Sequence, residues 1–127
     1  MDYTKFSGTY TVRRLFRDDI PSIFALCEKN PQYYEHCPPF VTPESIEADR
    51  KAMPQRKAGQ EQDKYYLGYF DVHHRLVAVM DFIDHYPDAQ SGFIGFFMME
   101  KDLQGTGVGS SIITELCACL AQWDYQS

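Results

Sequence analysis

Three glycines stand at alternate positions directly before an apolar run in the stretch DLQGTGVGSSIITEL, residues 102–116. Gly105, Gly107 and Gly109 each cost backbone entropy that a residue with a side chain would not, so the backbone either bends there or is approached closely. The first N–H groups of a helix have no partners inside it, and the helix dipole adds partial positive charge at the same point. A glycine turn at a helix start can therefore hold a phosphate. The alternative is a tight turn that packs a helix closely against a sheet.

Acidic and histidine side chains also interrupt or end the apolar runs before these glycines. Asp81 interrupts the run LVAVMDFI, where a carboxylate is costly without a partner or a purpose, although strand alternation could also turn it toward solvent. Asp84 and His85 follow at the end of that run, and Glu100 ends the run GFIGFFMME. For Glu100 the alternatives are a solvated strand end or a pair with Lys101.

Hydrophobic patterning predicts the elements that must position these residues. Alternating or β-rich runs predict strands over residues 10–16, 65–71, 75–84 and 92–100, with a hairpin at the sequence VHH between the second and third. Helical spacing and capping residues predict helices from Asp18 as N-cap to about Lys29, from Thr42 to about Met53, and from Gly107 to Gln122. The order is therefore β-α-α-β-β-β-α, an α/β fold with a mixed sheet.

The same patterns predict how some segments lie. Strand 92–100 is apolar on both faces, which predicts a central place in the sheet. The prolines of NPQYYEHCPPFVTP predict a loop over residues 30–43, and the polar stretch 54–64 is expected to be mobile. The buried stripe of the last helix is expected to be Val108, Ile112, Ile113, Leu116 and Leu120.

Length and composition limit the class of protein. The 127 residues predict a single domain, 1–127, and the net charge of −6 argues against a nucleic-acid surface, which normally needs a basic patch. The four cysteines, Cys27, Cys37, Cys117 and Cys119, form no C-x-x-C pair and predict buried free thiols in a reducing cytoplasm. No metal site is expected, because His73 and His74 fall in the predicted turn. No apolar run reaches membrane-spanning length, so no membrane association is expected.

The glycine pattern excludes two common phosphate-binding motifs. A Walker A loop needs a lysine after its last glycine, and none follows here. A dinucleotide-binding fingerprint needs a third glycine where Ser110 stands, and a further strand with an acidic residue about 20 positions on. A nicotinamide cofactor is therefore not expected.

The segment Gln104-Gly105-Thr106-Gly107-Val108-Gly109 resembles motif A of the GNAT (GCN5-related) N-acetyltransferases, whose pattern is Q/R-x-x-G-x-G/A. The preceding FIGFFMMEKDL resembles the fourth strand of that family, and the following SSIITELCACLAQ resembles its third helix. With the order of the earlier elements, the resemblance covers roughly residues 10–122.

The resemblance implies a coenzyme site. Backbone N–H groups of Gly105, Thr106, Gly107, Val108, Gly109 and Ser110 would hold the pyrophosphate of acetyl-CoA, the acetyl donor, and Gln104 would open that loop. The pantetheine arm would lie along Phe97, Met98 and Met99 like an added strand. A backbone N–H of that strand would polarise the thioester carbonyl.

The resemblance also implies an acceptor site beside the thioester. Transfer to an amine needs the amine neutral, so a base is useful, and Asp81 and Glu100 are the predicted catalytic residues. Tyr33, Tyr34 and Phe40 lie where the family shapes its acceptor pocket, with ordinary packing as the alternative for each.

One departure from the family bears on the activity. GNAT domains continue past this helix with another strand, a helix and usually a hairpin, so the chain is expected to be a truncated GNAT domain. The predicted function is acetyl transfer from acetyl-CoA to a primary amine of a small molecule or a protein. The alternatives are a non-catalytic module that binds acyl-CoA or a protein partner, and a helix–sheet protein without a ligand. An unpaired edge of strand 92–100 predicts a homodimer or association with a missing C-terminal part.

Overall fold

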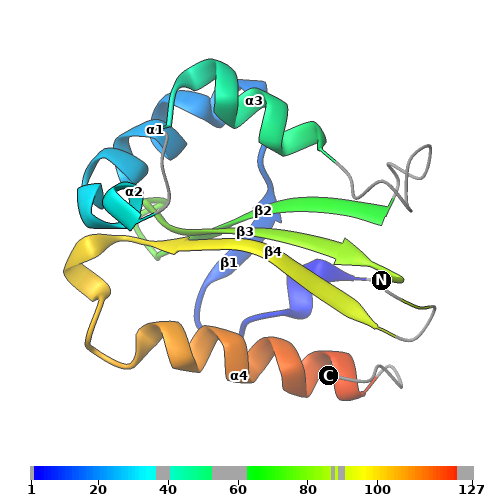
Figure 1. The fold of residues 1–127 in the computed structure, drawn as a ribbon. Helices are drawn as coiled ribbons and strands as arrows, with labels where there is room; N and C mark the ends of the chain where they lie inside the picture. The colour runs from blue at the N-terminus through cyan, green and yellow to red at the C-terminus, as the bar shows by residue number, and fades with distance from the viewer. Residues whose placement is uncertain (1, 37–40, 53–62, 87, 89–90, 123–127) are drawn as a thin grey trace.

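The protein folds as an antiparallel sheet between two helical layers. The computed structural model describes residues 2–36, 41–52, 63–86, 88 and 91–122. Four strands pair in the order β1-β2-β3-β4. The helices α1, α2 and α3 cover one face of this sheet, and α4 covers the other (Figure 1).

The bounds of the elements follow the predicted runs closely. The strands are β1 Thr11–Arg14, β2 Lys64–Phe70, β3 Leu76–Asp84 and β4 Gly92–Met99. The helices are α1 Ile20–Glu28, α2 Pro31–His36, α3 Pro43–Lys51 and α4 Val108–Ala121. Short 3-10 turns are η1 Tyr3–Lys5, η2 Arg17–Asp19 and η5 Lys101–Leu103.

Each helical layer packs on its own hydrophobic core. Ile112 and Leu116 of α4 pack with Phe82 of β3 in the core on one face. Ile23 of α1 and Ile46 of α3 pack with Val79 of β3 in the core on the other face. The predicted stripe of α4 is confirmed at Ile112, Leu116 and Leu120, which are buried, while Val108 and Ile113 are only partly buried and Cys119 joins the buried set.

The central strand is β3, so the prediction that strand 92–100 is central is wrong. In β3 every residue except Asp81 is buried, whereas β4 has one paired neighbour and alternates between exposed and partly buried residues before Met98. The strand is apolar on both faces because both helical layers reach it. Met98 packs in the core of α1 and α3, and Met99 packs in the core of α4.

All strand pairings in the described residues are antiparallel, which differs from the mixed sheet expected. The predicted hairpin between β2 and β3 is confirmed. The Asp71 carboxylate accepts hydrogen bonds from the N–H groups of His73 and Arg75, and the N–H of His74 donates to the Asp71 carbonyl. The predicted mobile stretch lies outside the described residues except for its end, where Lys64 begins β2.

Two predictions about the first helices need correction. A helix, α2, begins at Pro31 within the predicted loop, because proline is tolerated in the first turn of a helix, where its missing N–H has no partner to lose. The N-cap residue of α1 is Asp19 and not Asp18, because α1 begins only at Ile20 and Asp18 lies in the middle of η2. Thr42 caps α3 as predicted, its hydroxyl accepting from the N–H of Ser45 at 3.0 Å.

The cysteines of the described residues are free thiols. Cys27 and Cys119 are buried, and Cys117 is exposed, so the expectation of burial is wrong for Cys117. Cys37 lies outside the described residues. None of the helices in the described part of the chain combines the length and the apolar character that crossing a membrane requires.

Candidate functional site

The glycine loop, residues 104–110, joins the end of β4 to the start of α4. Gly105 and Gly107 have φ angles of +80° and +88°, in the left-handed region that glycine adopts without strain. Gly107 is the N-cap of α4, and it offers no side chain to the first amides of the helix. The first helical hydrogen bond runs from the N–H of Ser111 to the carbonyl of Gly107 at 3.0 Å. The amides before Ser111 therefore stand at the positive end of the helix dipole.

The three glycines serve two different purposes. A β-carbon built at Gly105 or Gly107 would meet no atom within 4 Å, so these two bend the backbone and leave open space beside it. A β-carbon at Gly109 would lie 3.4 Å from Cε of Met99, so Gly109 permits close packing of α4 on β4. The open turn and the tight helix–sheet contact that the sequence left as alternatives are both present.

Main-chain groups of β4 point alternately to β3 and to the open edge of the described sheet. The N–H of Glu100 donates to the carbonyl of Val77 at 2.7 Å. Two residues before Glu100, Met98 of β4 pairs with Val79. Since hydrogen-bonded pairs alternate along an antiparallel ladder, the main-chain groups of Met98 face β3. Those of Phe97 and Met99 face the edge that no strand of the described residues occupies.

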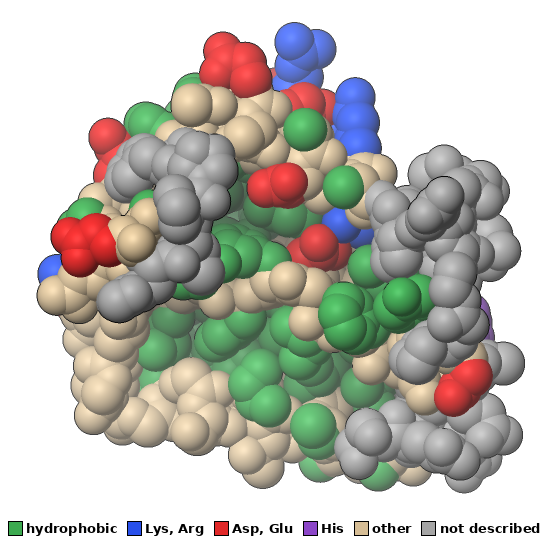
Figure 2. Space-filling view, in the orientation of Figure 1, with side chains coloured by type: hydrophobic (Ala, Val, Ile, Leu, Met, Phe, Trp, Pro, Cys, Tyr) green, Lys and Arg blue, Asp and Glu red, His purple; other side chains and the backbone are tan. Residues whose placement is uncertain are grey.

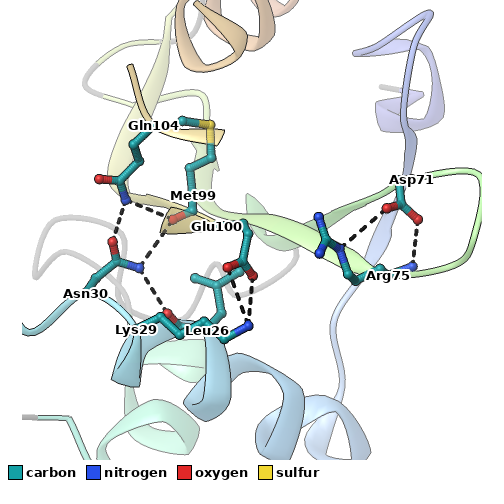
Figure 3. A network of polar contacts seen from close by, with 8 residues as sticks. All are labelled: Leu26, Lys29, Asn30, Asp71, Arg75, Met99, Glu100 and Gln104. Atoms are coloured by element: carbon teal, nitrogen blue, oxygen red, sulfur yellow. Dashed lines mark hydrogen bonds and ion pairs between the residues drawn. The ribbon is translucent and has the colours of Figure 1, made fainter. Parts of the chain in front are cut away.

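An amide network around the buried Asn30 closes this edge at Met99 (Figure 3). The Asn30 side chain donates from Nδ2 to the carbonyl oxygens of Leu26 at 2.9 Å and Met99 at 3.3 Å. Gln104 Nε2 donates to the Met99 carbonyl at 3.1 Å and to Asn30 Oδ1. The Met99 carbonyl is thus already bonded, and the Gln104 side chain is turned toward α1.

A pocket of about 450 Å³ lies beside this network. Residues 30–33, at the junction of α1 and α2, line one side, and residues 97–99, 101 and 104 line the other. Hydrophobic side chains gather across the middle of the same face, between the upper helical layer and α4 (Figure 2). The pocket is therefore continuous with the open edge of β4 and with the start of the glycine loop.

Asp81 lies on the face of β3 that α1 and α3 cover, in an ion pair with Lys64. Lys64 Nζ donates to Asp81 Oδ2 at 2.7 Å and to the Ala52 carbonyl at 2.7 Å. The Asp81 side chain is 14% exposed, and the Lys64 side chain is 6% exposed. Burial raises the pKa of Asp81, and the hydrogen bond from Lys64 opposes that rise. Asp81 Oδ1 is buried and has no hydrogen-bond partner among the described residues.

A β-bulge on β4 lies directly across from Asp81. Asp81 pairs with Phe96 and the next residue, Phe82, pairs with Ile94, so Gly95 is the extra residue. A β-carbon at Gly95 would lie 3.3 Å from Asp81 Oδ2. The carboxylate therefore stands against the backbone of β4 at the point where the ladder is interrupted.

The other predicted catalytic residue, Glu100, is neither solvated nor paired with Lys101. Glu100 is 3% exposed, and its carboxylate lies 3.4 Å from Nζ of Lys29, the residue that follows α1. At Lys101, the next residue, the chain leaves the extended conformation and begins η5. Glu100 lies four residues after Phe96, the partner of Asp81, so the backbone positions of Glu100 and Asp81 lie ~13 Å apart along the sheet. The structure does not bring them together.

Asp84 and His85 form a separate group at the far end of β3. Asp84 is buried, its carboxylate lies 3.5 Å from His85 Nε2, and Asp63 offers a second carboxylate. Three possible ligand atoms of Asp63, Asp84 and His85 lie within 4.8 Å of one another. Strand alternation puts Asp84 on the α4 face of the sheet, opposite to the face that holds Asp81.

The aromatic residues predicted near an acceptor pocket divide between lining and packing. Tyr33 lines the pocket and meets the ring of Phe96 edge-on at a centroid distance of 5.9 Å. Tyr34 packs against the core of α1 and α3, and burial together with a hydrogen bond to Cys27 raises its pKa. Phe40 lies outside the described residues.

Sequence reasoning missed two residues of this site, Asn30 and Lys64. Asn30 stood at the start of the predicted loop, and Lys64 stood at the end of a polar stretch. The one available signal was positional: both are polar residues at the boundary of an apolar run.

The comparisons with solved structures identify the fold. An acetyltransferase from Thermus thermophilus matches with a TM-score of 0.70 and 18% identity, over 87% of this chain and 68% of that one. A GNAT family acetyltransferase from Brucella melitensis in complex with acetyl-CoA matches with a TM-score of 0.55 and 15% identity, over 94% of this chain and 73% of that one. A chimera of spermidine N-acetyltransferase from Vibrio cholerae matches with a TM-score of 0.60 and 18% identity, over 84% of this chain and 59% of that one.

These matches show that the chain has the GNAT acetyltransferase fold, as the motif predicted. The chain spans 68%, 68%, 61% and 59% of the first four matched chains. No protein-family model matches it, and the comparison with curated proteins found no match.

Proposed function

We propose that this chain is an N-acetyltransferase domain that moves an acetyl group directly from acetyl-CoA to a primary amine of a small molecule or a protein. The observation that carries the proposal is a single continuous surface in a GNAT fold. An open strand edge, a pocket of about 450 Å³ and a helix start with two left-handed glycines follow one another along β4 and the glycine loop.

The described residues fit the coenzyme. The amides of Gly105 and of Gly107 to Ser110 would bind the pyrophosphate, because the space beside Gly105 and Gly107 is open, whereas the N–H of Thr106 already donates to the Leu103 carbonyl. Phe97 and Met99 would bind the pantetheine arm through their outward main-chain groups. Met98 would contribute its side chain to the core instead, since its main chain faces β3.

The chemistry proposed for the protein is proton removal beside the strand. Acetyl-CoA supplies an acetyl group activated as a thioester. The acceptor amine must be neutral to react, and an amine that arrives as an ammonium ion must lose a proton. Asp81 Oδ1 would accept that proton, because Lys64 occupies only Oδ2. The raised pKa of Asp81 makes it a better base than a solvated aspartate.

The proposed acceptor is a primary amine. One structural neighbour is a spermidine N-acetyltransferase by its description, and another is a ribosomal-protein-alanine N-acetyltransferase, so small-molecule and protein amines are both proposed for this fold. A cytoplasmic location also remains a prediction.

Two measurements test the proposal. Isothermal titration with coenzyme A reports binding, and thiol release from acetyl-CoA in the presence of an amine panel reports turnover. Binding with turnover on at least one amine is expected. Binding without turnover would favour the non-catalytic acyl-CoA module. The absence of both binding and turnover would overturn the proposed function.

A further inference from the structure

We propose that Asn30 is a positioning residue for the glycine loop, acting on the coenzyme site through Gln104. Asn30 stands after the end of α1, 74 residues before Gln104 in the chain, and it is not part of any glycine motif. The inference deepens the proposed function, on which its coenzyme-binding part rests.

Every polar atom of the Asn30 carboxamide has a partner (Figure 3). Nδ2 donates to Leu26 of α1 and to Met99 of β4, and Oδ1 accepts from Gln104 at the start of the loop. Asn30 is only 7% exposed and its bonds to Leu26 and Met99 are buried, so water cannot easily replace them, while the bond from the exposed Gln104 is partly buried. A buried polar group that loses its partner costs about 1–3 kcal/mol, so the amide holds the three segments in one arrangement.

The network also sets where an added strand must stop. The Met99 carbonyl points to the open edge of β4, where a pantetheine amide could otherwise bond to it. Asn30 and Gln104 both donate to that oxygen, at 3.3 Å and 3.1 Å. An extended ligand can therefore use the main chain of Phe97 and the N–H of Met99 but not the carbonyl of Met99. This limit fixes the register in which the ligand meets the glycine loop.

Asn30 joins the two walls of the pocket as well. One wall is the junction of α1 and α2, and the other is the end of β4 with Lys101 and Gln104. The Asn30 carboxamide links these walls directly by hydrogen bonds, beside the Lys29–Glu100 ion pair. A loop that is already held in place loses less conformational freedom when a ligand binds, which favours affinity.

Hydrogen exchange in the coenzyme-free protein tests the positioning role without reference to activity. The amides of Gln104, Thr106 and Ser111 donate within the loop and at the helix start, so they report its order. Asn30→Ala and Gln104→Ala should each speed the exchange of these amides by about tenfold, which corresponds to about 1.4 kcal/mol of lost local protection. Glu28→Ala, at an exposed position of α1, is the matched control and should leave them unchanged.

A second variant guards against a failure to fold. Asn30→Asp keeps the size of the side chain and an acceptor for Gln104 but cannot donate to Leu26 or Met99 when ionised. It should also speed the exchange. Unchanged exchange in every folded variant at positions 30 and 104 would overturn the proposal.

A double-mutant cycle in coenzyme A affinity tests the route through Gln104. Asn30→Ala and Gln104→Ala should each raise the Kd by about tenfold, and the double variant should be no weaker than the weaker single variant. Fully additive losses would overturn the route. Absence of coenzyme binding in the wild-type protein would refute the proposed function, while the exchange result would still decide whether Asn30 positions the loop.

Discussion

At Gly107, backbone conformation and ligand approach can be separated by the choice of side chain. Its φ of +88° is strained for a residue with a β-carbon, but asparagine tolerates the left-handed region far better than a β-branched residue. Gly107→Val should lose about 1–2 kcal/mol of stability, whereas Gly107→Asn should lose less. Both put a side chain into the open space beside the loop, so both should weaken coenzyme A binding at least tenfold, about 1.4 kcal/mol.

Thermal unfolding and isothermal titration on the two variants check this expectation. Thr114→Ala is the control, because Thr114 is an exposed residue of α4 outside the glycine loop. It should keep its affinity within a few-fold. A folded Gly107→Asn protein with wild-type affinity would show that the pyrophosphate does not lie there.

The Asp81–Lys64 pair should control the acid side of the pH profile of turnover. The hydrogen bond and charge of Lys64 lower the pKa of Asp81, while burial and the charge of Asp49 raise it. Lys64→Met removes the lowering contributions, so the pKa rises and the fall in kcat on acidification should begin at a higher pH. Asp81→Asn should lower kcat more than the KM for acetyl-CoA and should remove that limb. The test is kcat measured against pH. The other ionisable groups around the pair are kept unchanged in these variants: Tyr66 of β2, Cys27 of α1, and Asp49 and Arg50 of α3. An unshifted profile in a folded Lys64→Met protein would demote the pair to a structural role.

The residues of the site differ in how far the sequence could predict them. Asp81 was predicted because an acidic residue inside an apolar strand needs a partner. Its partner Lys64 could not be predicted, since cross-strand neighbours depend on register. Glu100 was placed correctly at a strand end, but pairing with Lys101 was wrong, because the chain turns into η5 at Lys101 and the partner of Glu100 is Lys29, which lies 71 residues earlier in the sequence.

Among the elements, the connection from β1 to α1 depends on Asp19. Arg13 contacts both Asp19 oxygens, at 3.1 Å and 3.0 Å, and the N–H of Phe16 donates to the same carboxylate at 2.8 Å. The hydrogen bond from Arg13 is the largest cause that lowers the pKa of Asp19 below 3.8. A lowered folded-state pKa gives stability that is complete above the unfolded value and is lost as the pH falls through the folded value.

Asp19→Asn should therefore lower the free energy of unfolding at pH 7 by about 1 kcal/mol, a modest loss because Arg13 is half exposed and water screens the pair. The difference from wild type should disappear as the pH is lowered well below 3.8. Urea unfolding at several pH values measures it. A difference that persists at the acid end would assign the effect to packing instead of charge.

The type of most elements was predictable from the sequence, but the place of each strand in the sheet was not. β-rich runs and helical spacing identified the strands and α1, α3 and α4, because β2 and β3 are buried on both faces while these helices bury one face. The helix α2 was missed because its proline lies in the first turn, where it starts a helix as readily as it breaks one. The rank of β3 and β4 in the sheet was reversed, since apolar residues on both faces report covering layers and not neighbouring strands.

For the whole molecule, the open edge of β4 predicts self-association. Its outward main-chain groups have no strand beside them in the described residues, and Phe93 near its start is 43% exposed. Such an edge invites pairing with another chain. We expect a homodimer of the 127-residue chain in light scattering. A monodisperse monomer with a cooperative thermal transition would show that the edge is protected in another way.

The central claim concerns the whole surface along β4 and the glycine loop, and amide chemical shifts test it most directly. Coenzyme A is titrated into the 15N-labelled protein, and the resonances are followed to saturation. We expect saturable shifts at Phe97, Met99 and the amides of residues 105–110, with β1 at the opposite edge of the sheet unaffected. No saturable shift, or shifts centred on β1, would contradict it.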